Sequence, residues 1–158
     1  MPLASVRRVT LLTMSENPHS PTTRPSVRVV HGPDAYANAI EALKAFAWSH
    51  VAGKRVLLKP NAGRMAAFGT GTNTNPQGVA AAIDFFRAAG ADVAVGESPI
   101  SGVRSLEALE ISGIAEAARA RGCRLIDLDA RPPVVTAIPG GKAIRALKVC
   151  ADVTESDF

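Results

Sequence analysis

Aromatic residues make up only 4% of this chain, and cysteine occurs twice, at Cys123 and Cys150. With so few aromatics, a core must be built from alanine, valine, leucine and isoleucine. The 47% hydrophobic content of the 158 residues is enough for one such domain. The cysteines form no CxxC pair, and no histidine lies at the spacing of a zinc site. The pattern favours two small buried residues in a reducing compartment over a disulfide or a metal site.

The sequence also lacks a long apolar run and a dense basic patch. No stretch approaches the roughly 20 apolar residues of a membrane-spanning helix, and the short run after Arg7 and Arg8 ends too soon for an export signal. Of the net charge of +4, residues 1–26 hold three arginines against one glutamate, which leaves 15 basic and 13 acidic residues elsewhere. A nucleic-acid-binding domain usually carries a denser basic face. We therefore expect a cytoplasmic protein that binds neither membrane nor nucleic acid.

Composition divides the chain into two segments. Residues 1–26 mix proline, serine, threonine and arginine with little periodicity, which predicts a disordered N-terminal extension. Residues 27–158 carry the periodic apolar pattern of a folded domain. We expect these residues to form a single α/β domain.

The folded segment alternates between two kinds of pattern. Short runs rich in β-formers occur at 27–30, 54–58, 92–96 and 124–128. Helical sequence separates them at 34–53, 76–90 and 105–121, with a break expected at Gly113. This alternation predicts a mostly parallel, doubly wound (Rossmann-like) sheet. Residues 134–138 and 143–149 flank a glycine pair and predict an antiparallel hairpin added late.

A polar loop follows the strand that ends at Leu58, and it begins with Lys59. Its segment 62–75 is long for a strand-to-helix connection, which usually takes about 2–6 residues. Ligands of open α/β sheets bind outside the carboxyl ends of the strands. The hydroxyls, amides and free N–H groups at the next helix start, together with Lys59, predict an anion cradle. The alternative is a surface lysine beside a helix that Asn75 merely caps.

The next strand ends in Glu97 and Ser98, which we expect to line the opposite wall of the same site or to cap a turn. The predicted ligand-binding residues are Lys59, Asn61, Thr72, Asn73, Asn75, Glu97 and Ser98. Their predicted ligand is a small anion, either a phosphate or a carboxylate. Asp127 and Asp129 share a strand face, as a metal pair or as a solvated edge. No dinucleotide fingerprint, Walker motif or nucleophile elbow occurs, so the sequence leaves the cofactor, the catalytic residues and the question of enzyme activity open.

Three motifs in order carry a family resemblance: Lys59-Pro60-Asn61, Thr74-Asn75-Pro76 and Gly96-Glu97-Ser98-Pro99. In this order and at comparable spacing they resemble the "K-P-N", "T-x-P" and "G-[DE]-S-P" motifs of the family called domain of unknown function 362 (DUF 362). The resemblance covers most of residues 27–158. It implies an α/β fold, often accompanied by a ferredoxin-like iron–sulfur segment.

The chain departs from that family in two respects. It has no cysteine cluster, so cluster binding does not carry over. It also ends at Phe158, where the family usually continues into a further strand and a "K-x-K-T-H" segment. We therefore expect an incomplete domain that self-associates or needs a partner segment. Three hypotheses follow: an anion-binding α/β protein, either enzyme or binding module; a redox-associated protein whose cluster segment is missing; or a non-catalytic remnant.

Overall fold

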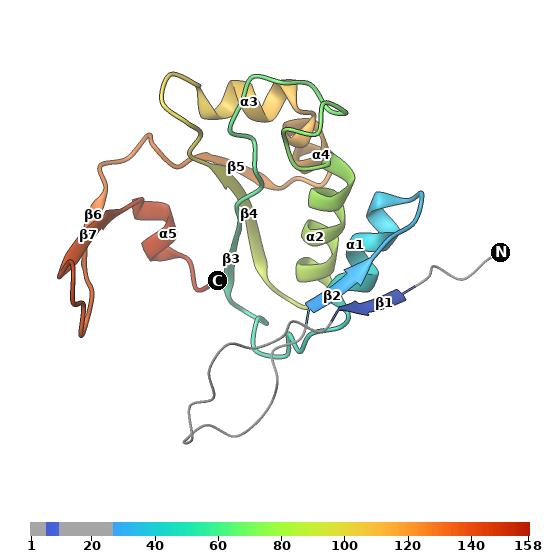
Figure 1. Ribbon diagram of the computed structural model, residues 1–158, viewed down its shortest axis with the longest axis horizontal. Helices are drawn as coiled ribbons and strands as arrows, with labels where there is room; N and C mark the ends of the chain where they lie inside the picture. The colour runs from blue at the N-terminus through green and yellow to red at the C-terminus, as the bar shows by residue number, and fades with distance from the viewer. Residues whose placement is uncertain (1–5, 10–26) are drawn as a thin grey trace.

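The central element of the fold is a three-stranded parallel sheet in the order β3-β4-β5. The computed structural model describes residues 6–9 and 27–158 (Figure 1). Strands β3 (Arg55–Leu58), β4 (Asp92–Glu97) and β5 (Arg124–Asp127) pair in parallel register, with Val56 opposite Val93 and Val95 opposite Leu125. The prediction of an α/β fold with parallel strands is confirmed.

Helices connect the strands of this sheet. They are α2 (Pro76–Ala88), α3 (Ser105–Ile111) and α4 (Ile114–Arg119). The break between α3 and α4 falls at Gly113, as predicted, because its φ of 79° lies in the left-handed region. On the other side of the sheet lies the short helix α5 (Ala151–Glu155), so both sides carry helix, although the second side carries much less (Figure 1).

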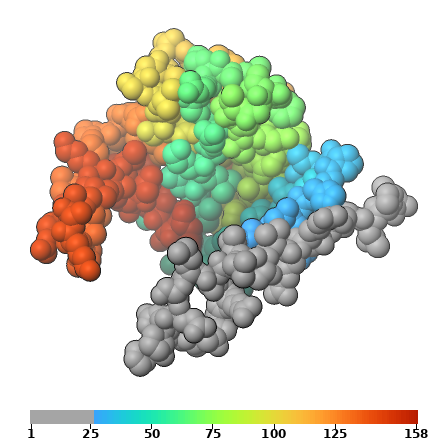
Figure 2. Space-filling view, viewed as in Figure 1, coloured from blue at the N-terminus to red at the C-terminus, as the bar shows by residue number. Residues whose placement is uncertain are grey.

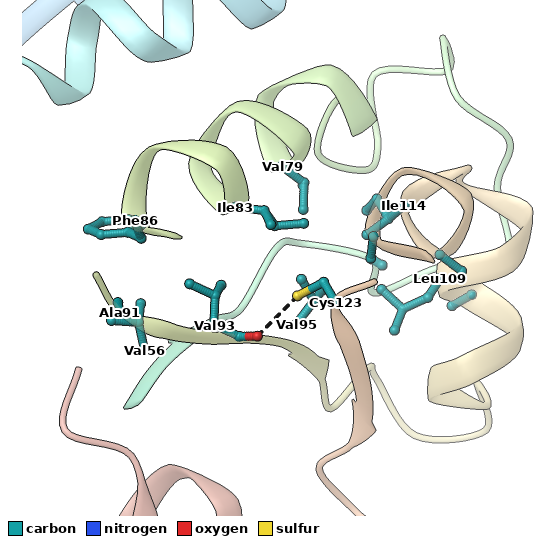
Figure 3. Packing of buried hydrophobic residues seen from close by; sticks show 14 of the residues in the cluster. Val56, Val79, Ile83, Phe86, Ala91, Val93, Val95, Leu109, Ile114 and Cys123 are labelled. Carbon is teal, nitrogen blue, oxygen red and sulfur yellow. Dashed lines mark hydrogen bonds between the residues drawn. The ribbon is translucent and has the colours of Figure 1, made fainter. Parts of the chain in front are cut away.

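The core lies between α2, α4 and the sheet. Val79, Ile83 and Phe86 of α2 point toward Val56, Val93 and Val95 of the strands (Figure 3). Cys123 is buried there, as the sequence predicts, and its thiol donates a hydrogen bond of 3.2 Å to the carbonyl of Val93. Cys150 is partly buried. The core thus depends on small aliphatic side chains, in keeping with the scarcity of aromatics.

Helix α1 (Ala35–Leu43) packs against α2 and is shorter than the sequence predicts. Helical sequence was expected to continue to Gly53, and that boundary is wrong. The indole N–H of Trp48 donates a 2.8 Å bond to the carbonyl of Leu43 and so satisfies one of the acceptors at the helix end. The Trp48 ring packs edge-on against Phe86, with ring centroids 4.9 Å apart. Tertiary packing of this tryptophan ends the helix before the glycine does.

The N-terminal strands form a separate ribbon. Strand β1 (Val6–Val9) pairs antiparallel with β2 (Val27–Val30), with Val6 opposite Val30. The sequence predicts a disordered extension over residues 1–26, and these four residues are instead extended and paired with β2. The remainder of that segment lies outside the described residues. Likewise, β2 does not join the central sheet.

The predicted late hairpin consists of β6 (Val134–Ala137) and β7 (Ala146–Val149), which form their own two-stranded sheet. All four residues of β6 are exposed, and Val135 reaches 68%. In the space-filling view, this hairpin projects from the body of the molecule (Figure 2). The two strands contact mainly each other, and an isolated two-stranded ribbon is at best marginally stable in water, so this hairpin should be the least stable part of the sheet structure.

The last two residues run along the outer edge of β3, where the C-terminus lies beside that strand in Figure 1. The N–H of Phe158 donates to the carbonyl of Arg55 at 3.2 Å, and its carbonyl accepts from the N–H of Leu57 at 2.7 Å. This is the bonding pattern of a parallel strand pair. The carboxylate of Asp157 accepts the N–H of Arg55 at 2.9 Å, and this bond lowers the pKa of Asp157.

Candidate functional site

An ion pair between Lys59 and Glu97 joins the carboxyl ends of β3 and β4. The Lys59 ammonium donates to Oε1 of Glu97. The Lys59 side chain is 50% exposed, whereas that of Glu97 is only 1% exposed. The sequence predicts that these two residues line opposite walls of one site, and in the structure they are in direct contact. They meet because parallel strands in register end at the same edge of the sheet.

The buried carboxylate of Glu97 is fully engaged. Its Oε2 accepts the N–H of Ala62 at 2.7 Å, and its Oε1 accepts the N–H of Ser98 at 2.8 Å in addition to the Lys59 bond. A buried charge needs such partners, since burying a charge without them is strongly unfavourable. Glu97 therefore ties the loop after β3 to the loop after β4 and holds Lys59 at the sheet edge.

The long loop after β3 is closed at its neck by Asn61 and Thr74. The N–H of Asn61 donates to the Thr74 hydroxyl at 2.8 Å, and the N–H of Thr74 donates to the carbonyl of Asn61 at 2.7 Å. The side-chain amide of Asn61 donates to the carbonyl of Thr72 at 3.1 Å. These bonds bring Asn61, a predicted ligand-binding residue, into direct contact with Thr74 of the second family motif.

Asn73 and Thr72 hold the loop from within. The Asn73 amide nitrogen donates to the carbonyls of Arg64 and Ala66 at 3.2 Å and 2.8 Å. The Thr72 hydroxyl shares a 2.8 Å hydrogen bond with that of Thr70. The side-chain oxygen Oδ1 of Asn73 is buried and has no hydrogen-bond partner among the described residues. Both predicted site residues thus bind the loop itself.

Asn75 caps helix α2, as the simpler of the two sequence interpretations proposed. Its side chain accepts the N–H of Gln77 at 2.9 Å. Pro76 has no N–H, and the N–H groups of Gly78 and Val79 both donate to the carbonyl of Asn75. The first turn of α2 therefore offers few free donors, and Lys59 is the main group there that can bind an anion.

Ser98 faces β5 rather than the Lys59 side. Its hydroxyl and the Asp129 carboxylate form a 2.7 Å hydrogen bond. The Asp127 carboxylate accepts the hydroxyl of Ser105 at 2.8 Å and the N–H of Asp129 at 3.0 Å. Within residues 6–9 and 27–158, no group of three or more metal-ligating side chains comes together. Ser98 and the two aspartates therefore connect the ends of β4 and β5.

A cavity of about 190 Å³ opens beside Lys59, between the end of β3 and the first turns of α2. Its lining comprises Leu58, Lys59, Pro60, Thr74, Gly78, Val79 and Ala82. Sequence reasoning identified Lys59 but assigned Val79 and Ala82 only to the core face of the helix. The missed signal was Gly78, a glycine in the first turn of a helix that follows a candidate site.

Comparison with known families agrees with this architecture. The family model described as "Domain of unknown function (DUF362)" matches residues 56–158, a span that contains all of β3 except Arg55, together with the long loop, α2, β4 and the cavity. The chain therefore belongs to the DUF362 family, as the motif resemblance predicts. No curated protein and no solved structure matches it. In the described part of the chain, no helix has the length and apolar character to cross a membrane.

Proposed function

We propose that this protein binds a small anion, a phosphate or a carboxylate, at Lys59. The observation that carries the proposal is a half-exposed ammonium, held by a buried carboxylate, at the wall of a cavity at the carboxyl end of a parallel strand. Sites in open α/β sheets occupy this position. The proposal concerns binding.

The donors at the cavity suit an anion. A lysine ammonium has three N–H donors, and Glu97 accepts one of them. The Thr74 hydroxyl accepts the N–H of Asn61, which leaves its own proton to donate into the cavity that it lines. Each charge-assisted bond is worth about 1.5–3 kcal/mol. In this proposal Asn61, Thr72, Asn73 and Asn75 shape the loop, and Glu97 orients the lysine.

Titration of the ¹⁵N-labelled chain with phosphate, sulfate and acetate tests the proposal. We expect the amide resonances of Thr74 and Gln77 to shift in wild type and to stay fixed in Lys59→Met. Lys148→Met is the matched control, because Lys148 is an exposed lysine of the hairpin, and it should retain the shifts. Shifts that are absent in wild type, or that persist in a folded Lys59→Met variant, would contradict anion binding at this site.

We propose in addition that residues 27–158 form one domain and that the protein is cytoplasmic. We also propose that the exposed hairpin of β6 and β7 promotes self-association. Val134, Val135 and Leu147 expose 44%, 68% and 42% of their surface on its two strands. Natural proteins usually cover or charge such strands. Sedimentation velocity at increasing concentration should show association in wild type and less of it in Val135→Lys. If the protein is a monomer at every concentration, the proposal of self-association through the hairpin is wrong.

A further inference from the structure

We infer that the ligand at Lys59 is a small carboxylate with an apolar body, of the size of a short-chain fatty acid or benzoate. This inference rests on the proposed anion site and specifies its substrate class. Four of the seven residues that line the cavity are apolar side chains, namely Leu58, Pro60, Val79 and Ala82. Lys59 is the one charged residue of that lining. A fully hydrophilic anion would leave most of the wall without a partner.

The charge balance at Lys59 also favours a ligand with an apolar body. Glu97 lies against the ammonium and offsets its charge, so a bare anion meets a dipolar group and not an isolated cation. Attraction at long range is correspondingly weaker. An apolar body adds binding that does not depend on charge, at about fourfold in affinity for each methylene removed from water. At contact distance the lysine still donates charge-assisted hydrogen bonds to the carboxylate and holds it at the cavity mouth.

Gly78 lines the cavity without a side chain. A Cβ placed on this glycine would meet no atom within 4 Å, so the space beside it is empty and not filled by packing. Glycine weakens a helix relative to alanine, and no contact in the structure requires its small size. Ala82 lies one turn further along the same helix face and also lines the cavity. The two small residues leave room along α2 for an elongated ligand that starts at Lys59.

The cavity is open to solvent, and its volume indicates the size of the apolar body that it can cover. An engineered apolar cavity of about 150 Å³ in another protein holds benzene. The cavity beside Lys59 measures about 190 Å³. It therefore accommodates a body of about six carbon atoms, by comparison with that benzene site. Acetate is too small to fill the cavity, whereas hexanoate and benzoate fit it.

The experiment compares acetate, butyrate, hexanoate, benzoate, 1-hexanol and inorganic phosphate by calorimetry on the full chain. For wild type, we expect affinity to increase about fourfold per methylene from acetate to hexanoate, and hexanol to bind much more weakly than hexanoate. In Gly78→Leu the new side chain occupies the cavity, so hexanoate should bind no better than acetate. Gly78→Ala is the graded control, with an intermediate loss and an unchanged or higher melting temperature, because alanine favours the helix.

The possible failures are distinguishable. If acetate, hexanoate and phosphate bind with equal affinity and all depend on Lys59, the apolar-body inference is wrong and the anion site stands. If hexanoate binds Gly78→Leu as tightly as wild type, the cavity is not its site, and the inference is equally wrong. If no anion binds wild type, the proposed function fails and this inference fails with it.

Discussion

Replacing Glu97 by glutamine tests whether its carboxylate holds the two strand-end loops together. The carboxylate accepts three donors, from Lys59, Ala62 and Ser98, and is only 1% exposed. A glutamine amide has one oxygen and one NH₂ group, so in either orientation its NH₂ faces a donor. One buried N–H then loses its acceptor, at about 1–3 kcal/mol.

Lys59 is half exposed, so in the variant its ammonium can be solvated by water. The free energy of unfolding should therefore fall by about 2–4 kcal/mol, somewhat less than when a fully buried ion pair is broken. For a chain of this size that corresponds to a melting temperature lower by about 4–16 °C. Urea unfolding followed by the fluorescence of the single tryptophan measures it directly, because Trp48 packs against the core residue Phe86.

The matched control for this experiment is Glu107→Gln. Glu107 also pairs with a basic residue, Arg104, but its side chain is 41% exposed. Exposed pairs contribute about 0–1 kcal/mol, so the control should unfold close to wild type. A Glu97→Gln variant that unfolds within about 0.5 kcal/mol of wild type would refute the role assigned to the buried carboxylate.

Thiol reactivity, packing and pH provide further tests. Burial raises the pKa of the Cys123 thiol, so a thiol reagent at neutral pH should modify the partly buried Cys150 first and Cys123 only on unfolding; equal rates would contradict the buried position. Gly96→Ala would place a Cβ 2.9 Å from a leucine side chain and should lower the free energy of unfolding by about 1–3 kcal/mol, measured in urea; no change would show that the neighbours move aside easily. The guanidinium of Arg131 lowers the pKa of Glu155, so their interaction stabilises the fold above the unfolded pKa of the carboxyl and is lost as the pH falls through the lowered value. The free energy of unfolding should therefore decline more steeply in wild type than in Arg131→Gln as the pH falls below about 4.5, and parallel curves would show that the pair contributes nothing.

The strand and helix pattern around the cavity could be predicted because its signals are local. Strands β3, β4 and β5 are short runs of β-formers; β4 and β5 end in an acidic residue, and Lys59 follows β3 directly. Helix α2 begins after Asn75-Pro76, where the amide side chain caps the helix and proline fits its first turn. Such signals depend on residues within a few positions of one another, and a single sequence contains them all.

Other features depend on contacts between distant residues and could not be read in this way. Lys59 and Glu97 are separated by a loop and a helix, and their contact follows from the register of β3 against β4. The end of α1 depends on the hydrogen bond that the Trp48 indole donates to the carbonyl of Leu43. Helix α5 has no side-chain cap at Cys150, so its start carries no local signal. Of the seven predicted ligand residues, Lys59 alone lines the cavity.

The position of the last two residues affects how binding at Lys59 is measured. Because Phe158 pairs with β3 in the manner of a parallel strand, residues attached after it would continue along the same edge. The next backbone groups along that edge belong to Leu57 and Lys59. A C-terminal affinity tag would thus run along the edge of β3 toward Lys59. Protein for ligand titrations is best tagged at the N-terminus, or freed of its tag before measurement.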